Sequence, residues 1–393
     1  MKLAFIIGAR PQFIKLSPLC RALDAQNRSS KGNGITSVII HTGQHYDYEL
    51  SKIFFDQLLI PSPKYNLEVG SAAHGKQTGI MMEKIEPVLL QEAPDIAIVF
   101  GDTNSTLAGA LVASKLHIPV THVEAGLRSF NRRMPEEINR LVADHVSTLL
   151  FCPTDRAVMN LRREGFTNIV DNLHPSDDIV EVLKKTSASN PLVVEAGDIM
   201  YDAFLYTEAL AASTSTILKD LSLSPRQYAL LTVHRAENTD DSASLERIIA
   251  FLEKEDPLSP MIFPVHPRTR KLIDEKRIPF PGSMRMIPPV SYFDMLMLER
   301  NSAIIYTDSG GVQKEAFFMR VPCVTLREET EWTETVESGW NRLMGDSRDK
   351  ARKVNNTSQL DQYPFGDGHA ADRHLQILLA FCRSRNPEEK KSL

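Results

Sequence analysis

Acidic residues in three stretches of the chain could carry proton-transfer chemistry. Asp102 ends the apolar run "IAIVFGD", and Glu124 ends the next such run, "VTHVEAG". Further on, "MPEEINR" opens a helix-like segment with Glu136 and Glu137 directly after Pro135. Carboxyl groups whose surroundings push their pKa values apart can act as an acid and a base on one substrate. The sequence therefore predicts an acid–base site.

The positions of these carboxylates along the chain suggest which of them are catalytic and which are structural. Proline suits the first turn of a helix, and the helix dipole favours acidic residues there, which is a sufficient explanation for Glu137. Asp102 and Glu124 instead follow strands, at the edge where open α/β sheets bind ligands. We expect these two, with Glu136 nearby, to form a catalytic set of three.

The stretch "GARPQFIK" (8–15) ends another strand in a glycine followed by two cations. Gly8 permits a tight turn at the carboxyl edge of the sheet, so Arg10 and Lys15 could face an anion there. The alternative is a strand-to-helix turn with two solvated cations. The stretch is neither a GxGxxG loop nor a Walker loop, which argues against a dinucleotide or P-loop NTPase site.

The stretch "TDSGGVQKEAFF" (307–318) places Ser309, Gly310 and Gly311 between a strand and a helix. Free N–H groups and the helix dipole at such a point suit a phosphate or diphosphate. Glu315, one turn inside the helix, could accept ribose hydroxyls. The alternative is a helix that is simply capped by Ser309.

Two histidines end apolar runs in the same half of the chain. His234 lies in "TVHRAEN" and His266 in "PVHPRTRK", each followed by arginine. A single histidine of this kind is usually structural, but two beside arginines favour phosphate recognition. No HExxH or similar spacing occurs, so we expect no metal.

The elements that position these residues alternate between strands and helices. Apolar runs at 3–9, 37–43, 96–102, 120–126 and 149–154 are typical of buried parallel strands. Segments 106–116 and 137–146 have helical spacing of apolar residues. This alternation predicts an α/β fold with a doubly wound sheet.

A second strand series follows a charged, weakly periodic stretch at 171–191, which we interpret as a linker or surface insertion between domains. The second series comprises 228–234, 261–266, 284–290, 303–309 and 321–326. With the 393-residue length, this predicts two domains, at about 1–175 and 190–370. Residues 371–384 have the pattern of an amphipathic helix.

The composition narrows the class of protein. The net charge of −5 and the lack of a long basic run argue against nucleic acid as a partner. Four cysteines lie far apart without a CxxC pair, which fits a reduced cytoplasmic chain. The apolar run before Gly8 is too short for a signal peptide or a membrane span. We expect a soluble cytoplasmic protein.

Taken together and in order, the motifs resemble those of the non-hydrolysing UDP-N-acetylglucosamine 2-epimerases. The stretches that carry the resemblance are "GARPQFIK", "HTGQHYD", "GDTNSTLAGA", "HVEAGLRS", "MPEEINR", "TVHRAEN", "PVHPRTRK", "TDSGGVQKEA" and "TLREETEWTETVESGWN". The resemblance implies a GT-B-type fold of two Rossmann-like domains with a cleft between them, and a C-terminal helix at about 371–385 that packs back on the first domain.

The resemblance also implies an isomerase that works as a homodimer and without a cofactor. In such enzymes UDP is eliminated across C1–C2 of the sugar and adds back while C2 is reprotonated on the other face. Matching motifs make Asp102, Glu124 and Glu136 the catalytic carboxylates. The UDP-sugar contacts matched by motif are Arg10, Lys15, His234, Ser309, Gly310, Gly311 and Glu315.

Several alternatives stay open at this point. "GARPQF" replaces the usual GTRPE-type start, and "SFNRRMPEE" resembles the branch that acts on UDP-2,3-diacetamido-2,3-dideoxyglucuronate. Arg132 or Arg133 could pair there with a uronate carboxylate, or lie in a solvated loop. A GT-B glycosyltransferase would need an acceptor site, and a nucleotide-sugar sensor would have no need of three acid–base groups.

Overall fold

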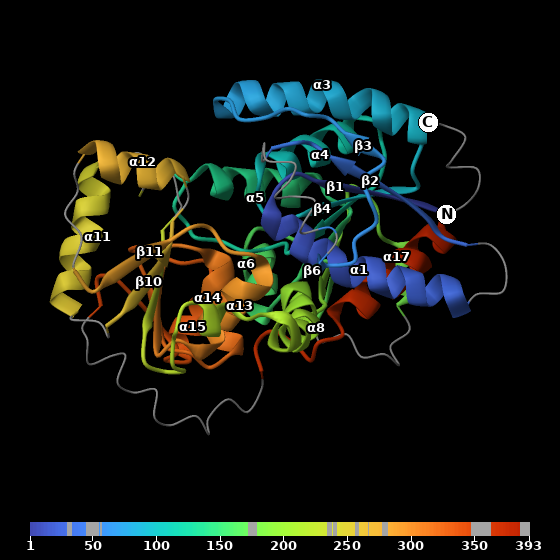
Figure 1. The fold of residues 1–393 in the computed structure, drawn as a ribbon. Helices are drawn as coiled ribbons and strands as arrows, with labels where there is room; N and C mark the ends of the chain where they lie inside the picture. Colours follow the sequence, from blue (N-terminus) through green and yellow to red (C-terminus); the bar gives the residue numbers. More distant parts are fainter. Residues whose placement is uncertain are drawn as a thin grey trace. The chain divides into compact units, whose positions relative to one another are not determined.

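In a computed structural model, the chain divides into two compact units, Met1–Ala203 with Tyr363–Leu393, and Phe204–Gln362 (Figure 1). The structure describes residues 1–29, 34–44, 55, 57–171, 179–233, 238, 242–255, 259–265, 267–276, 282–346 and 363–385. Compact units are not by themselves independently folding domains, so the domain limits 1–175 and 190–370 stay a prediction.

The first unit contains an eight-stranded sheet in the order β3-β2-β1-β4-β5-β6-β8-β7, and every pairing in it is parallel. Its strands are β1 (Lys2–Ile7), β2 (Thr36–His41), β3 (Tyr65–Asn66), β4 (Ile96–Phe100), β5 (Val120–Val123), β6 (Leu149–Cys152), β7 (Ile169–Val170) and β8 (Leu192–Glu195). The strand order reverses between β1 and β4, and ligands bind at such a switch point in open α/β sheets.

Helices cover this sheet, as parallel strands require, because both faces of such a sheet are apolar. The helices are α1 (Arg10–Ser29), α3 (His74–Glu92), α4 (Asn104–Lys115), α5 (Pro135–Val146), α6 (Asp155–Arg163), α7 (Val180–Lys184) and α17 (Ala370–Ser384). Helix α8 (Ile199–Thr214) begins in the first unit and ends in the second. One core layer joins Ala4 and Ile6 of β1 to Met81 and Ile85 of α3. In Figure 1, α3 runs alongside α4, and α17 lies beside α1.

The second unit contains a six-stranded parallel sheet in the order β11-β10-β9-β12-β13-β14. Its strands are β9 (Ala229–Thr232), β10 (Met261–Pro264), β11 (Met284–Ile287), β12 (Ile304–Thr307), β13 (Cys323–Thr325) and β14 (Asn341–Leu343). Counted along the chain, this is the 3-2-1-4-5-6 order of a dinucleotide-binding sheet, with its switch point between β9 and β12. The α/β class predicted from the sequence is confirmed.

Strand β9 of the second sheet is buried on both of its faces. Leu231 of β9 packs in one core cluster, while Leu230 packs in another on the opposite side. The helices of this unit are α9 (Ile217–Asp220), α11 (Ser242–Glu255), α12 (Pro267–Lys276), α13 (Tyr292–Asn301), α14 (Gly310–Phe318) and α15 (Thr333–Glu337). In the described part of the chain, no helix is both long and apolar enough to cross a membrane.

The stretch 171–191, which we interpreted as a linker, belongs to the first unit where the structure describes it. Its residues 172–178 lie outside the described residues. Helix α7 packs against α17, and the strand after it, β8, pairs with both β6 and β7. The described part of this stretch therefore lies between β7 and β8, inside the first unit.

Candidate active site

Three strands of the first sheet end side by side at its switch point, and the predicted residues follow them. Gly8 comes after β1, Asp102 after β4 and Glu124 after β5. Gly8 has to lack a side chain, because a Cβ there would lie 2.0 Å from Thr42 Oγ1 and 2.3 Å from Ser105 Oγ. The turn after β1 is therefore packed directly against the start of α4.

Gln12 joins the turn after β1 to the end of β4. Its Oε1 accepts hydrogen bonds from the backbone N–H groups of Gly8 (2.7 Å) and Ala9 (3.1 Å). Its Nε2 donates to the Phe100 carbonyl over 2.9 Å and to the Thr103 hydroxyl over 3.0 Å. An amide can accept and donate at once, whereas an ionised carboxylate only accepts. This explains how "GARPQF" works with Gln12 in place of glutamate.

Glu124 is held in a conformation that few residues other than glycine adopt, with φ = +73°. Such a conformation costs about 1–3 kcal/mol and persists only where the surroundings impose it. Here the backbone N–H groups of Glu124 and Ala125 both donate to the Phe151 carbonyl of β6, over 3.1 and 3.0 Å. Backbone strain of this kind is concentrated at functional sites, which agrees with the predicted catalytic role of Glu124.

Lys15 forms a buried ion pair with Glu124, with 2.5 Å between Nζ and Oε1. Both side chains are 8% exposed. Gly101, with φ = +62°, leaves room for this pair, because a Cβ there would lie 3.0 Å from Lys15 Nζ and 3.4 Å from Glu124 Oε1. We expected Lys15 to face a ligand anion; in this structure its anion is the carboxylate of Glu124.

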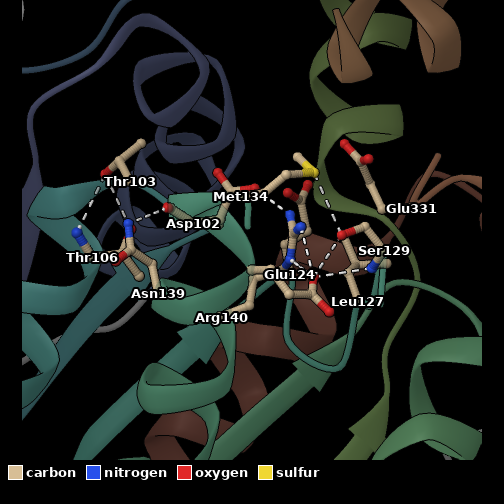
Figure 2. A network of polar contacts seen from close by, with 12 residues as sticks. Asp102, Thr103, Thr106, Glu124, Leu127, Ser129, Met134, Asn139, Arg140 and Glu331 are labelled. Atoms are coloured by element: carbon tan, nitrogen blue, oxygen red, sulfur yellow. Dashed lines mark hydrogen bonds and ion pairs between the residues drawn. The ribbon is translucent and has the colours of Figure 1, made fainter. Parts of the chain in front are cut away.

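Asp102 pairs with a second buried cation, Arg140 of α5, with 2.5 Å between Oδ2 and Nη1 (Figure 2). Burial raises the pKa of Asp102, and the Arg140 guanidinium and Lys15 ammonium offset part of that rise. The charges of Glu136 and Glu124 also raise it, as expected for carboxylates that share one site. The structure thus brings Asp102, Glu124 and Glu136 together.

Glu137 does more than complement the dipole of α5. Its carboxylate is 2% exposed and contacts Arg140 Nη2 over 2.9 Å. It also accepts hydrogen bonds from the backbone N–H groups of Ser129 (3.0 Å) and Phe130 (2.9 Å), which hold the loop before α5. These hydrogen bonds and Arg140 keep the pKa of Glu137 below its usual range, although burial alone would raise it. The dipole explanation is therefore incomplete.

The other arginines that the sequence analysis singled out are more exposed to solvent than Lys15 and Arg140. Arg132 and Arg133 are exposed in the loop that Glu137 anchors, and Arg10 is half-buried at the start of α1. Exposed arginines are expected in a solvated loop. They are also expected in a loop whose arginines bind a charged group of the substrate.

Ser309 caps α14 in the second unit, and its hydroxyl accepts a hydrogen bond from Val312 N–H over 3.5 Å. Gly310 is packed against its own unit, because a Cβ there would lie 2.6 Å from Glu331 Oε1 and 3.1 Å from Trp332 Nε1. A side chain at Gly310 would therefore force Glu331 to move within the second unit. A substitution of Gly310 would disturb Glu331 and Trp332 whether or not a diphosphate binds nearby.

Glu315 is buried in α14, where Tyr292 donates a hydrogen bond to its Oε1 over 2.8 Å. Burial raises the pKa of Glu315 to about 7, although Tyr292 and Lys314 act in the opposite direction. Burial and the charge of Glu315 raise the pKa of Glu299 as well. Burial therefore favours the neutral form of Glu315 more than it would for a glutamate in water.

Two of the sequence-based assignments lie outside the described residues, namely His234 and His266. Among the residues that the structure describes, no group of three or more His, Cys, Asp or Glu side chains could hold a metal ion. Sequence reasoning missed Arg140. Its spacing from Glu136 was a usable signal, since residues four apart share one face of a helix.

The fold and site define a class of protein. Two sheets have a Rossmann-like strand order, one with three carboxylates at its switch point and the other with a serine-capped helix at its own. This combination is typical of enzymes that perform acid–base chemistry on a nucleotide-linked substrate.

Comparison with known proteins makes the assignment specific. A family model described as UDP-N-acetylglucosamine 2-epimerase matches residues 27–379. UDP-N-acetylglucosamine 2-epimerase of Methanocaldococcus jannaschii is 45% identical, over 96% of this chain and 99% of that protein. UDP-2,3-diacetamido-2,3-dideoxy-D-glucuronate 2-epimerase of Pseudomonas aeruginosa is also 45% identical, with the same coverage. A crystal structure of the M. jannaschii enzyme with UDP-GlcNAc and UDP has a TM-score of 0.79, at 44% identity, covering 96% of this chain and 99% of that one.

The chain belongs to the UDP-N-acetylglucosamine 2-epimerase family. It is therefore an isomerase, and the GT-B-type fold of two Rossmann-like domains predicted from its motifs is confirmed.

Proposed function

We propose that this chain is a non-hydrolysing UDP-N-acetylglucosamine 2-epimerase. It interconverts UDP-GlcNAc and UDP-ManNAc, or a close UDP-2-acetamido sugar, in the synthesis of surface polysaccharide precursors. The observation that carries the proposal is that Asp102 and Glu124 follow neighbouring strands at the switch point of the first sheet, where the charges of Glu124 and Glu136 both raise the pKa of Asp102. Family membership supports the same conclusion.

The proposed reaction proceeds in two balanced steps. A carboxylate takes the C2 proton while the C1–O bond breaks, so that UDP leaves and a 2-acetamidoglucal forms. UDP then adds back to C1 while C2 receives a proton on the opposite face. Carboxylates on a strand end and a helix start can flank one sugar ring. Because the elimination and the re-addition move only a proton and UDP and transfer no hydride, neither step needs a redox cofactor.

The ion pairs give the carboxylates different surroundings for these steps. Lys15 lies against Glu124 and stabilises its charged form, while burial favours the neutral form of Asp102 against the pull of Arg140. A site with one stabilised carboxylate and one of raised pKa is suited to remove a proton from one face and return one to the other. We further propose that Arg10, His234, Ser309, Gly310, Gly311 and Glu315 bind the UDP moiety.

Product analysis tests the proposed function directly. The protein, without any acceptor or NAD, is incubated with UDP-GlcNAc, and the sugar is followed by NMR. We expect UDP-ManNAc to appear until an equilibrium ratio is reached. Transfer that requires an added acceptor would indicate a glycosyltransferase, and binding without turnover would indicate a sensor.

A second candidate substrate is UDP-2,3-diacetamido-2,3-dideoxyglucuronate. A relative named for that substrate is as similar to this chain as a relative named for UDP-GlcNAc, at 45% identity each. Arg132 and Arg133 are exposed and could pair with a uronate carboxylate.

Replacing both Arg132 and Arg133 with alanine tests this candidate. We expect kcat/KM to fall more for the uronate than for UDP-GlcNAc, because only the uronate carries the extra carboxylate. The same measurement on Arg163→Ala, an arginine outside this loop, serves as the control. An equal effect of the double substitution on both substrates would assign the two arginines to a solvated loop.

We also propose that the enzyme is a cytoplasmic homodimer, as the family resemblance implies. Light scattering should then give about twice the chain mass of 44.1 kDa, whereas a value near the chain mass would contradict the dimer.

A further inference from the structure

Asp102 is flanked by two peptide carbonyls, and each accepts a hydrogen bond from a buried side chain. His122 Nε2 lies 2.7 Å from the carbonyl oxygen of Gly101. Asn139 Nδ2 donates to the carbonyl oxygen of Asp102 itself over 2.9 Å (Figure 2). The two donors come from different elements, since His122 lies in β5 and Asn139 in α5.

Holding both of these peptide groups fixes the direction of the Asp102 side chain. The torsions φ and ψ describe rotation of the two rigid peptide planes around one α-carbon, so two fixed planes leave neither torsion free. The N–H group of Gly101 adds a third hydrogen bond, to the Val123 carbonyl over 3.0 Å. Arg140 then contacts the carboxylate at the end of a side chain whose starting direction is already set.

The neighbours of the His122 ring show which of its nitrogens donates to Gly101. A carbonyl oxygen can only accept, so Nε2 donates to Gly101. Nδ1 lies 2.6 Å from Asp144 Oδ1, and the other oxygen of Asp144 accepts from Arg128 Nη1 over 2.7 Å. Burial would raise the pKa of Asp144, but His122 and Arg128 outweigh it and hold that pKa below its usual range. Asp144 thus holds the His122 ring from its Nδ1 side, while Nε2 holds the Gly101 carbonyl.

We propose that His122 and Asn139 are positioning residues, a clamp on the two carbonyls beside Asp102 that keeps its carboxylate in line with the sugar C2 position. Asp144 supports the clamp by holding the His122 ring. The clamp rests on the proposed function, in which Asp102 carries a proton. Proton transfer requires heavy atoms about 2.6–3.2 Å apart, and a displacement of about 1 Å can cost roughly a hundredfold in rate.

Two amide substitutions of His122 test the clamp, because each imitates one ring nitrogen. In His122→Gln the amide nitrogen can take the place of Nε2 and still donate to Gly101. In His122→Asn the amide can reach only the place of Nδ1, beside Asp144. The clamp predicts that kcat falls roughly a hundredfold in His122→Asn and about tenfold or less in His122→Gln, with KM nearly unchanged in both. Equal losses, or a greater loss in His122→Gln, would overturn it.

Combination with Asp102→Asn shows whether His122 acts through Asp102. If it does, His122→Asn should lower kcat no further in the Asp102→Asn background, since the group that it positions is already gone. A further loss as large as in the wild-type background would overturn the clamp. If His122→Asn does not fold, as judged by its melting temperature, Asn139→Ala replaces it and should show the same loss of kcat and the same non-additivity.

The controls separate failure of the clamp from failure of the proposed function. Wild-type protein without epimerase activity, or an Asp102→Asn variant with full activity, would overturn the proposed function or the role of Asp102. Active wild type and impaired Asp102→Asn, together with unaffected His122 variants, would overturn the clamp alone.

Discussion

Two buried cations offset the charges of the carboxylates at the candidate site. Lys15 contacts Glu124, and Arg140 contacts both Asp102 and Glu137. Taking a charge out of water is costly unless a partner compensates for it, and removal of one partner of a buried pair typically costs about 3–5 kcal/mol. Lys15 and Arg140 therefore affect both the stability of the fold and the ionisation of the carboxylates. An alanine substitution of either residue would change both at once.

The pKa of Glu315 leads to a prediction about UDP binding. We expect Glu315 to accept ribose hydroxyls as a carboxylate, and its pKa is about 7. The ionised fraction then falls from about nine-tenths at pH 8 to about one-tenth at pH 6, so the affinity for UDP should drop about tenfold from this group as the pH is lowered. Calorimetry of UDP binding at both pH values measures the drop.

Glu315→Gln is the matched control for this prediction, because its side chain is neutral at both pH values. Titration of the UDP phosphates affects both proteins alike and cancels in the ratio of their affinities. The ratio of wild-type to variant affinity should therefore shrink about tenfold from pH 8 to pH 6. A ratio that does not change with pH would show that Glu315 does not bind UDP as a carboxylate.

The sequence predicted the site residues that follow strands, but it did not predict the residues that hold them in place. Asp102 and Glu124 could be placed at a sheet edge because apolar runs stop just before them. Lys15 could be placed near that edge because it lies in the segment that follows the first apolar run. The positive φ of Glu124 and the burial of Glu137 depend on contacts with residues far away or across a loop, namely Phe151 and Ser129. Spacing alone carries no information about such contacts. The amide of Asn139, however, stands in a motif that was already singled out.

At the scale of elements, helix α5 organises much of the first site. It contributes Glu136 to the carboxylate set, Arg140 and Asn139 to Asp102, and Asp144 to His122. These residues recur at intervals of three to four along the helix, so they lie on one face or beside it. A rigid helix that carries the supports of a neighbouring strand end sets the spacing between catalytic groups more precisely than a loop would.

Helix α17 returns to the first unit and carries a histidine with unusual surroundings. His374 is 1% exposed and stacks on Phe151 of β6, with 4.3 Å between ring centroids. Neither of its ring nitrogens has a hydrogen-bond partner among the described residues. Burial, with a smaller effect from Arg373, lowers the pKa of His374 to about 3. The ring is therefore neutral when folded and becomes protonated on unfolding in mild acid.

We predict that His374 lowers the free energy of unfolding as the solution becomes acidic. Between its folded pKa of about 3 and its usual value near 6.5, the unfolded chain binds the proton and the folded chain does not. The contribution of His374 to stability is thus complete above pH 6.5 and is lost as the pH falls toward 3. Between pH 7.5 and pH 5 the loss should be about 2 kcal/mol.

His374→Leu provides the test, since leucine keeps the position apolar and cannot be protonated. Urea unfolding at pH 7.5 and pH 5 should show that the free energy of unfolding falls by about 2 kcal/mol less in the variant than in the wild type. The same fall in both proteins would mean that His374 is protonated or exposed in the folded state.

Length decided which elements could be predicted. The longer apolar runs, such as those of β1 and β4, were recognised because consecutive buried residues mark a strand of a parallel sheet. Strands β3 and β7 have two residues each, and β14 has three. Such short strands exist only through their pairing with a neighbour, which no local pattern reports. Strand β8 was missed because it follows the stretch that we interpreted as a linker.

At the scale of the whole molecule, the same strand order occurs twice along the chain. The second sheet has the 3-2-1-4-5-6 order, and the first has it with two strands added at one edge. The predicted carboxylates lie near the switch point of the first sheet, while Ser309 and Glu315 come after β12, at the switch point of the second sheet. The proposed division of labour is that the first unit moves protons and the second holds UDP. This explains why a chain of two similar halves has different polar residues at its two switch points.

The central claim is that this enzyme breaks and remakes the C2–H bond by means of Asp102, Glu124 and Glu136. Turnover of UDP-GlcNAc in D2O, followed by NMR at C2, tests it most directly. Because the proton returns from an enzyme group that exchanges with water, the product should carry deuterium at C2, with no NAD added. Replacing any of the three carboxylates by its amide should slow this incorporation roughly a hundredfold or more. An epimerised product that retains protium at C2, or activity that requires NAD, would contradict the mechanism.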